Sequence, residues 1–407
     1  MRSLVQVYAS SLFSKIVFAL AGLLLIRLMP VGEFAAYTLA LSVVLLVAQP
    51  VIDLANRLYI IYAEIGSMAE RLTVVVALQS VVVAIAGTLV VLMAPVPAEL
   101  TSQTVLAIAA TIAFESVKTF YQANQDFRSF WRLESARAGL YAVAIAAVAI
   151  WNGTLTAAGA LGLLIVAALL SAVLPGWLAL RAANWRLLRI YWIATIERFS
   201  TISTVRRVVD RMDLAVYVLA QSVIGQVSVF TLNALSNQQQ LAAFGSASRY
   251  YGLIILALAS LQTVLLPAMQ TLSTNDEVSG LLRAHRRLSL YFSAAVALAA
   301  VSAIWAIPLI DAGRYPEALA TFWVLCASAI VSFTFGVFPI LALNMRLFRL
   351  LCWTSLLALG LCCLSNGLLI GPLGAVGAAL ATLITHAFFN VAVAILTSRR
   401  RRKPQDR

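Results

Sequence analysis

Two basic residues, Lys15 and Arg249, stand within long apolar runs of this 407-residue sequence. Lys15 is about eleven residues from either end of its run, too far for its side chain to reach water easily. A charge in hydrocarbon is costly unless it meets an opposite charge. Each base therefore predicts either an anionic ligand or a buried acidic partner, and Glu115 is the partner we expect for Lys15 in the second case.

Two further charged pairs have spacings that suit one face of a helix. Glu115 and Lys118 are three residues apart, so we expect them to pair and relieve each other's burial, with ion coupling as the alternative. Asp53 and Arg57 are four residues apart near the end of an apolar run. They either lie at a solvated helix end or form a latch that closes a gate.

Other kinds of site are not predicted. The 2 histidines are far apart, and the 4 cysteines have no paired-ligand spacing, so the sequence predicts no catalytic constellation, metal site, zinc site or disulfide framework. It has no glycine-rich phosphate loop with a Lys-Ser or Lys-Thr pair, and we expect no cofactor and no direct use of ATP. We do not expect an enzyme.

The elements that must position these residues are membrane-spanning helices. The composition is 62% hydrophobic and 11% charged, against roughly 45–50% and 25% in soluble domains. Lipid offers the backbone no hydrogen-bond partners, so the spans should be helical. We predict an all-α polytopic membrane protein of about twelve transmembrane helices, at 5–27, 34–55, 72–94, 104–123, 134–151, 157–180, 212–235, 241–269, 289–310, 317–340, 350–370 and 374–397.

The basic residues alternate between the connections. All of the 29 except Lys15, Arg27, Arg249 and Arg314 lie at the N-terminus, in every second connection or in the C-terminal tail. The rule that basic residues stay inside therefore predicts that both termini are cytoplasmic. The net charge of +13 is spread between apolar runs, which argues against nucleic-acid binding and favours contact with membrane lipid.

Short matches between the two halves predict an internal repeat. Glu33 at the start of span 2 corresponds to Gln240 at the start of span 8, at an offset of 207, and Gly159 in span 6 corresponds to Gly377 in span 12, at an offset of 218. We predict an N-terminal six-helix lobe at 1–182, a cytoplasmic interfacial linker at 183–211, a C-terminal six-helix lobe at 212–398 and a basic tail at 399–407. Transporters built from such repeats bind their substrate between the halves.

Several stretches together give the chain its likeness to a known family. They are 27–37 (RLMPVGEFAAY), 51–54 (VIDL), 247–250 (ASRY), 266–267 (LP), 307–310 (IPLI), 315–318 (YPEA) and 374–382 (GAVGAALAT). Because these stretches occur in this order, the chain resembles the Wzx-type polysaccharide flippases, which export O-antigen and exopolysaccharide units. Their superfamily also contains multidrug antiporters and the lipid II flippase. Ala55 departs from the glycine that is usual after the Asp-Leu pair.

The resemblance implies two six-helix lobes around a central cavity that opens alternately to each side. It implies that an undecaprenyl-diphosphate-linked oligosaccharide moves from the cytoplasmic to the periplasmic leaflet of the bacterial inner membrane. Polymerase and glycosyltransferases of the same pathway would be partners. Related flippases carry basic cavity residues on their first and eighth spans, so Lys15 and Arg249 are the expected substrate-binding residues.

Two alternatives remain open. A cation-coupled drug antiporter of the same superfamily would need acidic residues within the membrane, whereas this chain offers mostly bases at its candidate cavity positions. A membrane polymerase or ligase of lipid-linked sugars would need a sizeable outer loop with catalytic groups. Every outer connection predicted here is shorter than about ten residues.

Overall fold

The computed structural model describes residues 2–61, 96–123, 127–151, 153–182, 212–270 and 275–402. All regular secondary structure in these ranges is helical, which confirms the predicted all-α class. The helices are α1 (Arg2–Leu28), α2 (Val31–Ile61), α4 (Ala98–Ala123), α5 (Phe127–Trp151), α6 (Ala157–Ala182), α9 (Met212–Leu235), α10 (Gln238–Gln270), α11 (Asn275–Asp311), α12 (Ala318–Phe335), α13 (Val337–Asn344) and α14 (Phe348–Arg402).

Most of these helices correspond to the spans predicted from hydropathy, but α11 begins well before the predicted start at 289, and the span predicted at 317–340 is divided into α12 and α13. The span predicted at 212–235 has the same bounds as α9, and most others differ by a few residues at their ends. The predicted span 72–94 and the predicted linker 183–211 lie outside the described residues. Within the described part of the chain, seven helices are long and apolar enough to cross a membrane by length and composition.

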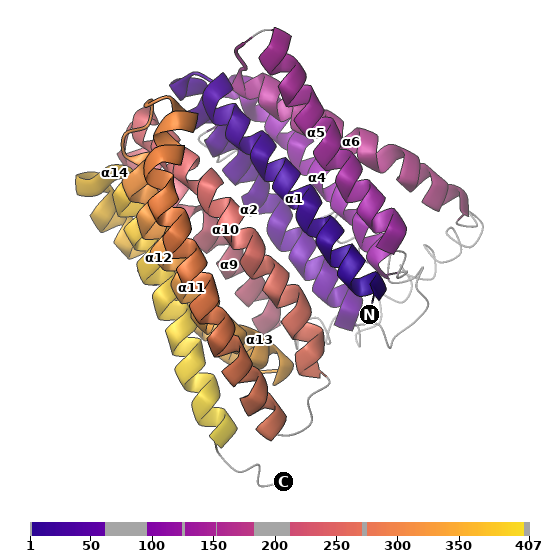
Figure 1. Cartoon of the computed structure of the whole chain (residues 1–407), viewed down its shortest axis with the longest axis vertical. Helices are drawn as coiled ribbons and strands as arrows, with labels where there is room; N and C mark the ends of the chain where they lie inside the picture. Colours follow the sequence, from indigo (N-terminus) through magenta and orange to yellow (C-terminus); the bar gives the residue numbers. More distant parts are fainter. Residues whose placement is uncertain are drawn as a thin grey trace. The chain divides into compact units, whose positions relative to one another are not determined.

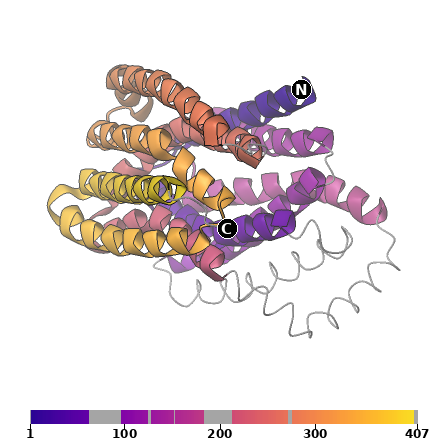
Figure 2. The same cartoon turned by 90° about the horizontal axis from the view of Figure 1, so that it is seen from below.

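Helix α14 contains the last two predicted spans. The chain turns between them at Gly374, whose backbone angles (φ 53°, ψ −129°) are not helical. A side chain on Gly374 would overlap the Oε1 atom of Gln240, so both the conformation and the space require glycine here. The two limbs of α14, gold and yellow, lie side by side in Figure 2.

The chain forms two compact units. The first comprises Met1–Ala21 with Leu28–Val218, and the second comprises Gly22–Arg27 with Leu219–Arg407. In the first unit α2, α4 and α5 pack around α6 (Figure 1). In the second unit α12 packs against α10, α11 and α14.

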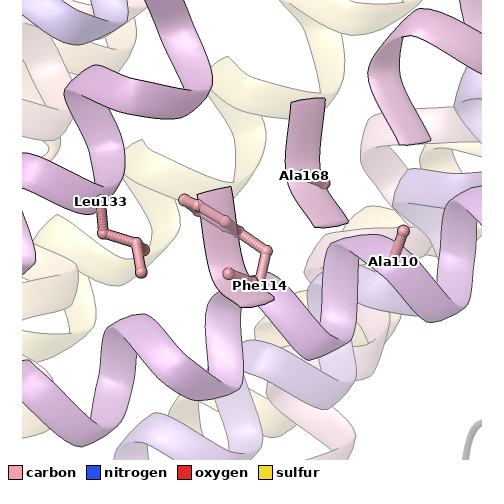
Figure 3. Packing of buried hydrophobic residues seen from close by; sticks show 5 residues of the cluster. Ala110, Phe114, Leu133 and Ala168 are labelled. Atoms are coloured by element: carbon pink, nitrogen blue, oxygen red, sulfur yellow. The ribbon is translucent and has the colours of Figure 1, made fainter. Parts of the chain in front are cut away.

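Small and large apolar residues interlock in the core of the first unit. Phe114 of α4 is fully buried against Leu133 of α5, and alanines of α4 and α6 complete the cluster (Figure 3). The alanines let the helices approach closely, which is typical of helix packing in membranes. By contrast, large apolar side chains such as Ile150 and Leu309 are 88% and 76% exposed, as expected for a surface that faces lipid.

One hydrogen bond occurs at equivalent positions in both units. In the first, the carboxylate of Glu33 at the start of α2 accepts from the backbone N–H of Ala157, at 2.6 Å. In the second, the side-chain oxygen of Gln240 near the start of α10 accepts from the N–H of Ala375, at 2.8 Å. Both amides begin a helix or helical limb and have no partner within it. The pairs are related by the offsets of 207 and 218 found in the sequence.

Candidate functional site

Four charged side chains of α4 and α5 form a network in the first unit. Lys118 Nζ lies 2.6 Å from Glu115 Oε2 and 3.3 Å from Glu134 Oε1, and Arg137 Nη1 lies 3.7 Å from Glu115 Oε1. The predicted pair of Glu115 and Lys118 is therefore present, and each of its members has a second partner on α5. These side chains are 5% to 21% exposed, so the network is largely shielded from solvent.

Aromatic rings cover the network on one side. The guanidinium carbon of Arg137 lies 3.9 Å from the centre of the Phe114 ring and 5.3 Å from that of Phe18. These distances suit cation–π contacts, which gain strength where water is excluded. Because Phe114 also belongs to the apolar cluster of Figure 3, the network is attached directly to the core of the unit.

Lys15 lies beside this network without joining it. It is half-buried, and its charge is close enough to act electrostatically on Glu115. Among the residues that the structure describes, no carboxylate oxygen lies within the 4.0 Å of an ion pair from Lys15. Glu115, which we expected as its structural partner, is paired with Lys118 and Arg137 instead. The two acids and two bases of the network balance, so Lys15 adds one excess positive charge.

Hydroxyl contacts position α1 around Lys15. The Oγ atoms of Ser14 and Ser135 are 2.8 Å apart and tie α1 to α5. The ring of Phe18 stacks on Tyr141, with 4.7 Å between ring centres, and the hydroxyl of Tyr141 is 3.2 Å from that of Tyr37. These contacts join residues more than 100 positions apart, so sequence spacing could not have revealed them.

Arg249, in the second unit, lies beside a glycine of α1. It is half-buried on α10, and a Cβ atom placed on Gly22 would lie 3.5 Å from its Nη1 atom. An alanine Cβ at position 22 would be in ordinary van der Waals contact with the guanidinium group, and the space for a larger side chain is limited by Arg249. Gly22 lies seven residues after Lys15 and so falls on the same face of α1, as the helical period predicts.

A buried carboxylate that binds the neighbours of Arg249 on α10 was missed by sequence reasoning. Asp311 ends α11 with 1% exposure, and it accepts hydrogen bonds from the Tyr250 hydroxyl (2.6 Å) and the Ser246 hydroxyl (2.8 Å). Both donors lie on α10 within three residues of Arg249. Burial, followed by the nearby Asp311 charge, raises the pKa of Tyr315 to about 12, so this phenol stays neutral.

Asp311 was missed because the sequence places it in a short outer connection, where an aspartate is ordinarily solvated. The available signal was its position directly after an apolar run. The structure shows that it fastens the end of α11 to α10, which fixes the helical turn that carries Arg249.

The remaining candidates, Asp53 and Arg57, both lie on α2. Asp53 accepts a hydrogen bond from Gln49 Nε2 at 3.1 Å, one turn earlier on the same helix. The side chain of Arg57 lies outside the described part of the structure. Both alternatives for these residues, a solvated helix end and a latch that closes a gate, therefore stay predictions.

No family model and no curated protein matches the chain by sequence. Solved structures do match. The lipid II flippase MurJ in an inward closed conformation has a TM-score of 0.71 at 11% identity, covering 97% of this chain and 87% of that one. An inward-facing multidrug resistance MATE family transporter of the MOP superfamily has a TM-score of 0.63 at 12% identity, covering 95% and 94%.

A third solved structure is an aspartate-to-asparagine variant of the Vibrio cholerae MATE transporter VcmN, with a TM-score of 0.63 at 14% identity, covering 99% and 97%. At these identities the likeness shows the fold. The chain therefore has the polytopic helical fold that a lipid flippase and multidrug transporters share, which confirms the predicted fold class.

Proposed function

We propose that the protein is a flippase that moves an undecaprenyl-diphosphate-linked oligosaccharide from the cytoplasmic to the periplasmic leaflet of the bacterial inner membrane. The route is alternating access between two lobes. Glycosyltransferases of the same pathway supply the substrate, and a polymerase consumes it. The termini are cytoplasmic, in keeping with the distribution of basic residues.

The observation that carries this proposal is the excess charge at Lys15. Lys118 and Arg137 are matched by the acids around them, whereas Lys15 adds a positive charge next to a balanced network. A base within a spanning helix is by default a candidate for binding an anion. The diphosphate of the lipid carrier is such an anion and cannot cross hydrocarbon without a counter-charge.

Arg249 supports the same conclusion from the second unit. Its planar guanidinium can hold a phosphate through two parallel hydrogen bonds, which an ammonium group cannot do. Asp311, Tyr250 and Ser246 fix the helical turn on which Arg249 stands, and Gly22 leaves room beside it. Such pre-organisation favours binding of a particular headgroup over a general attraction to negative charge.

The membrane potential can supply a driving force for this transport. A potential that is negative inside favours outward movement of an anion by about 2.3 kcal/mol per charge per 100 mV. A diphosphate with more than one negative charge gains a multiple of this value. Lys15 and Arg249 lower the free-energy cost of removing the diphosphate from water as it crosses the membrane. The membrane potential can then drive the headgroup outward.

Ligand binding tests the proposal directly. Purified protein in detergent should gain thermal stability from undecaprenyl diphosphate and much less from undecaprenol, because the bases recognise the phosphate groups. Lys15→Gln and Arg249→Gln should each reduce the gain, and Arg249→Lys should keep part of it. Equal stabilisation by the uncharged alcohol, or an unchanged response in both variants, would exclude a phosphate-binding role for these residues.

A drug/cation antiporter is the second candidate, and Asp311 is the observation that favours it. This buried carboxylate accepts hydrogen bonds from hydroxyl groups, and no basic side chain lies within ion-pair distance of it in the described part of the chain. Antiporters need acidic residues of this kind to hold a proton or a cation. Expression in a drug-sensitive strain separates the two: resistance that disappears with Asp311→Asn would favour the antiporter.

A further inference from the structure

A groove of about 310 Å³ opens on the second unit near the C-terminal end of α14. Phe335, the last residue of α12, and Phe338 of α13 form one side, and Ala394 and Ile395 of α14 form the other. Both phenylalanines are half-buried, and Ile395 is 48% exposed. The walls of the groove are therefore apolar and accessible from the surface of the unit.

The end of the groove is polar and positively charged. Ser398 and Arg399 line this end. Arg399 follows Ile395 by four residues, so the two residues lie on one face of α14, about 6 Å apart along the helix axis. The neighbouring arginines differ from Arg399. Arg400 is exposed but does not line the groove, and Arg401 donates a hydrogen bond to the hydroxyl of Ser279 on α11.

We propose that this groove binds an anionic phospholipid. One acyl chain lies between the two phenylalanines and Ile395, and the headgroup phosphate pairs with Arg399 and accepts a hydrogen bond from Ser398. Charge complementarity selects the occupant. A soluble phosphate would leave the apolar walls unused, and a zwitterionic lipid would bring a cation next to the arginines. Basic pockets between helices are typical sites for such headgroups.

The site would hold together the ends of three helices. Phe335 closes α12, Phe338 lies in the short α13, and Arg399 lies in the last turns of α14. A lipid that contacts all three stabilises their mutual packing, since it binds only the folded arrangement. The groove lies on the surface of one unit, and lipid binding there does not depend on what the protein transports.

Native mass spectrometry of the full-length protein in detergent tests the proposal, with phosphatidylglycerol and phosphatidylcholine as probes. The wild type should retain phosphatidylglycerol preferentially. Arg399→Gln should weaken that binding roughly five-fold, the contribution of one basic residue near an anionic lipid. Arg400→Gln is the matched control, because it removes the same charge one residue away, and it should bind as the wild type does.

A second variant tests the apolar wall. Ile395→Ser should lower the binding of both lipids several-fold without unfolding the protein, because Ile395 is largely exposed. A phosphatidylglycerol with a photoreactive acyl chain should crosslink to residues of α12, α13 or α14. Equal losses in Arg399→Gln and Arg400→Gln would overturn the proposal. So would crosslinks confined to other helices, or a dimer that forms through the groove in place of bound lipid.

Discussion

In the network on α4 and α5, each carboxylate is paired with a basic side chain. Lys15 lies beside this network and is not a member of its ion pairs. Glu115 is held by Lys118 and Arg137, and Lys118 also reaches Glu134. Removing one member of such a network leaves an uncompensated charge in a low dielectric, which is far more costly than losing an exposed pair. We therefore expect Lys118 to contribute mainly to the stability of the fold and Lys15 to contribute mainly to transport.

We predict that Lys118→Met lowers the unfolding free energy by on the order of 3 kcal/mol, because Glu134 then loses its ion pair with Lys118 and Glu115 keeps the ion pair with Arg137 alone. Lys15→Met should cost less than about 1 kcal/mol, since Lys15 has no carboxylate within ion-pair distance among the described residues. Thermal unfolding of the purified variants measures both values. Equal losses would mean that Lys15 is a structural member of the network.

The hydroxyl of Tyr250 should matter because it satisfies a buried carboxylate. We predict that Tyr250→Phe lowers stability by about 1 to 3 kcal/mol, the cost of leaving a buried charged acceptor short of a donor. Tyr251→Phe is the control, because no bond from the buried Tyr251 hydroxyl to a carboxylate is present in the described part of the chain. A larger loss for Tyr251→Phe would contradict this assignment.

Helices in both units are held by side chains that bond to the first amides of a neighbouring helix. Glu33 holds the start of α6, and Gln240 holds the start of the second limb of α14. Gln240 also donates a hydrogen bond from Nε2 to Glu317 Oε1 at 2.6 Å, which a carboxylate such as that of Glu33 cannot do because it has no N–H group. The acceptor is therefore a side-chain oxygen in both units, carried by a carboxylate in the first and by an amide in the second.

The exchange of carboxylate for amide can be tested at position 33. We predict that Glu33→Gln keeps near wild-type stability, because its amide oxygen can accept from Ala157 as Gln240 does from Ala375. Glu33→Leu should lose about 1 kcal/mol, as expected for a lost helix cap. If thermal unfolding shows that the two variants are equally destabilised, the charge of Glu33 matters more than its acceptor oxygen.

The turn in α14 depends on the glycine at position 374. Gly374→Ala should destabilise the protein by about 2 kcal/mol or more, because position 374 has a positive φ and a Cβ there would overlap Gln240. Gly371→Ala is the matched control, since nothing lies within 4 Å of the Cβ it would add. Circular dichroism melts should show a normal transition for Gly371→Ala and a lowered one for Gly374→Ala.

Both units have features that the sequence predicts and features that it does not. Hydropathy predicted the helices, because a span must be both apolar and about 20 residues long. Local spacing predicted the pair of Glu115 and Lys118. The contacts of Asp311 with Tyr250 and of Arg137 with Phe18 join residues distant in the chain, so they depend on which helices become neighbours. The groove beside Arg399 depends on the break between α12 and α13 in the same way.

Transport of a lipid-linked sugar by the whole molecule is the central proposal, and a flipping assay tests it most directly. Proteoliposomes containing undecaprenyl-diphosphate-linked oligosaccharide would be treated with a glycosidase that cannot cross the membrane, and sugar that arrives on the outer surface would be measured. We predict flipping by the wild type, partial flipping by Arg249→Lys, and a rate at least about ten-fold lower for Arg249→Gln, the loss of one charge-assisted hydrogen bond. A wild-type rate equal to that of protein-free vesicles, or an unchanged rate in Arg249→Gln, would contradict the proposal.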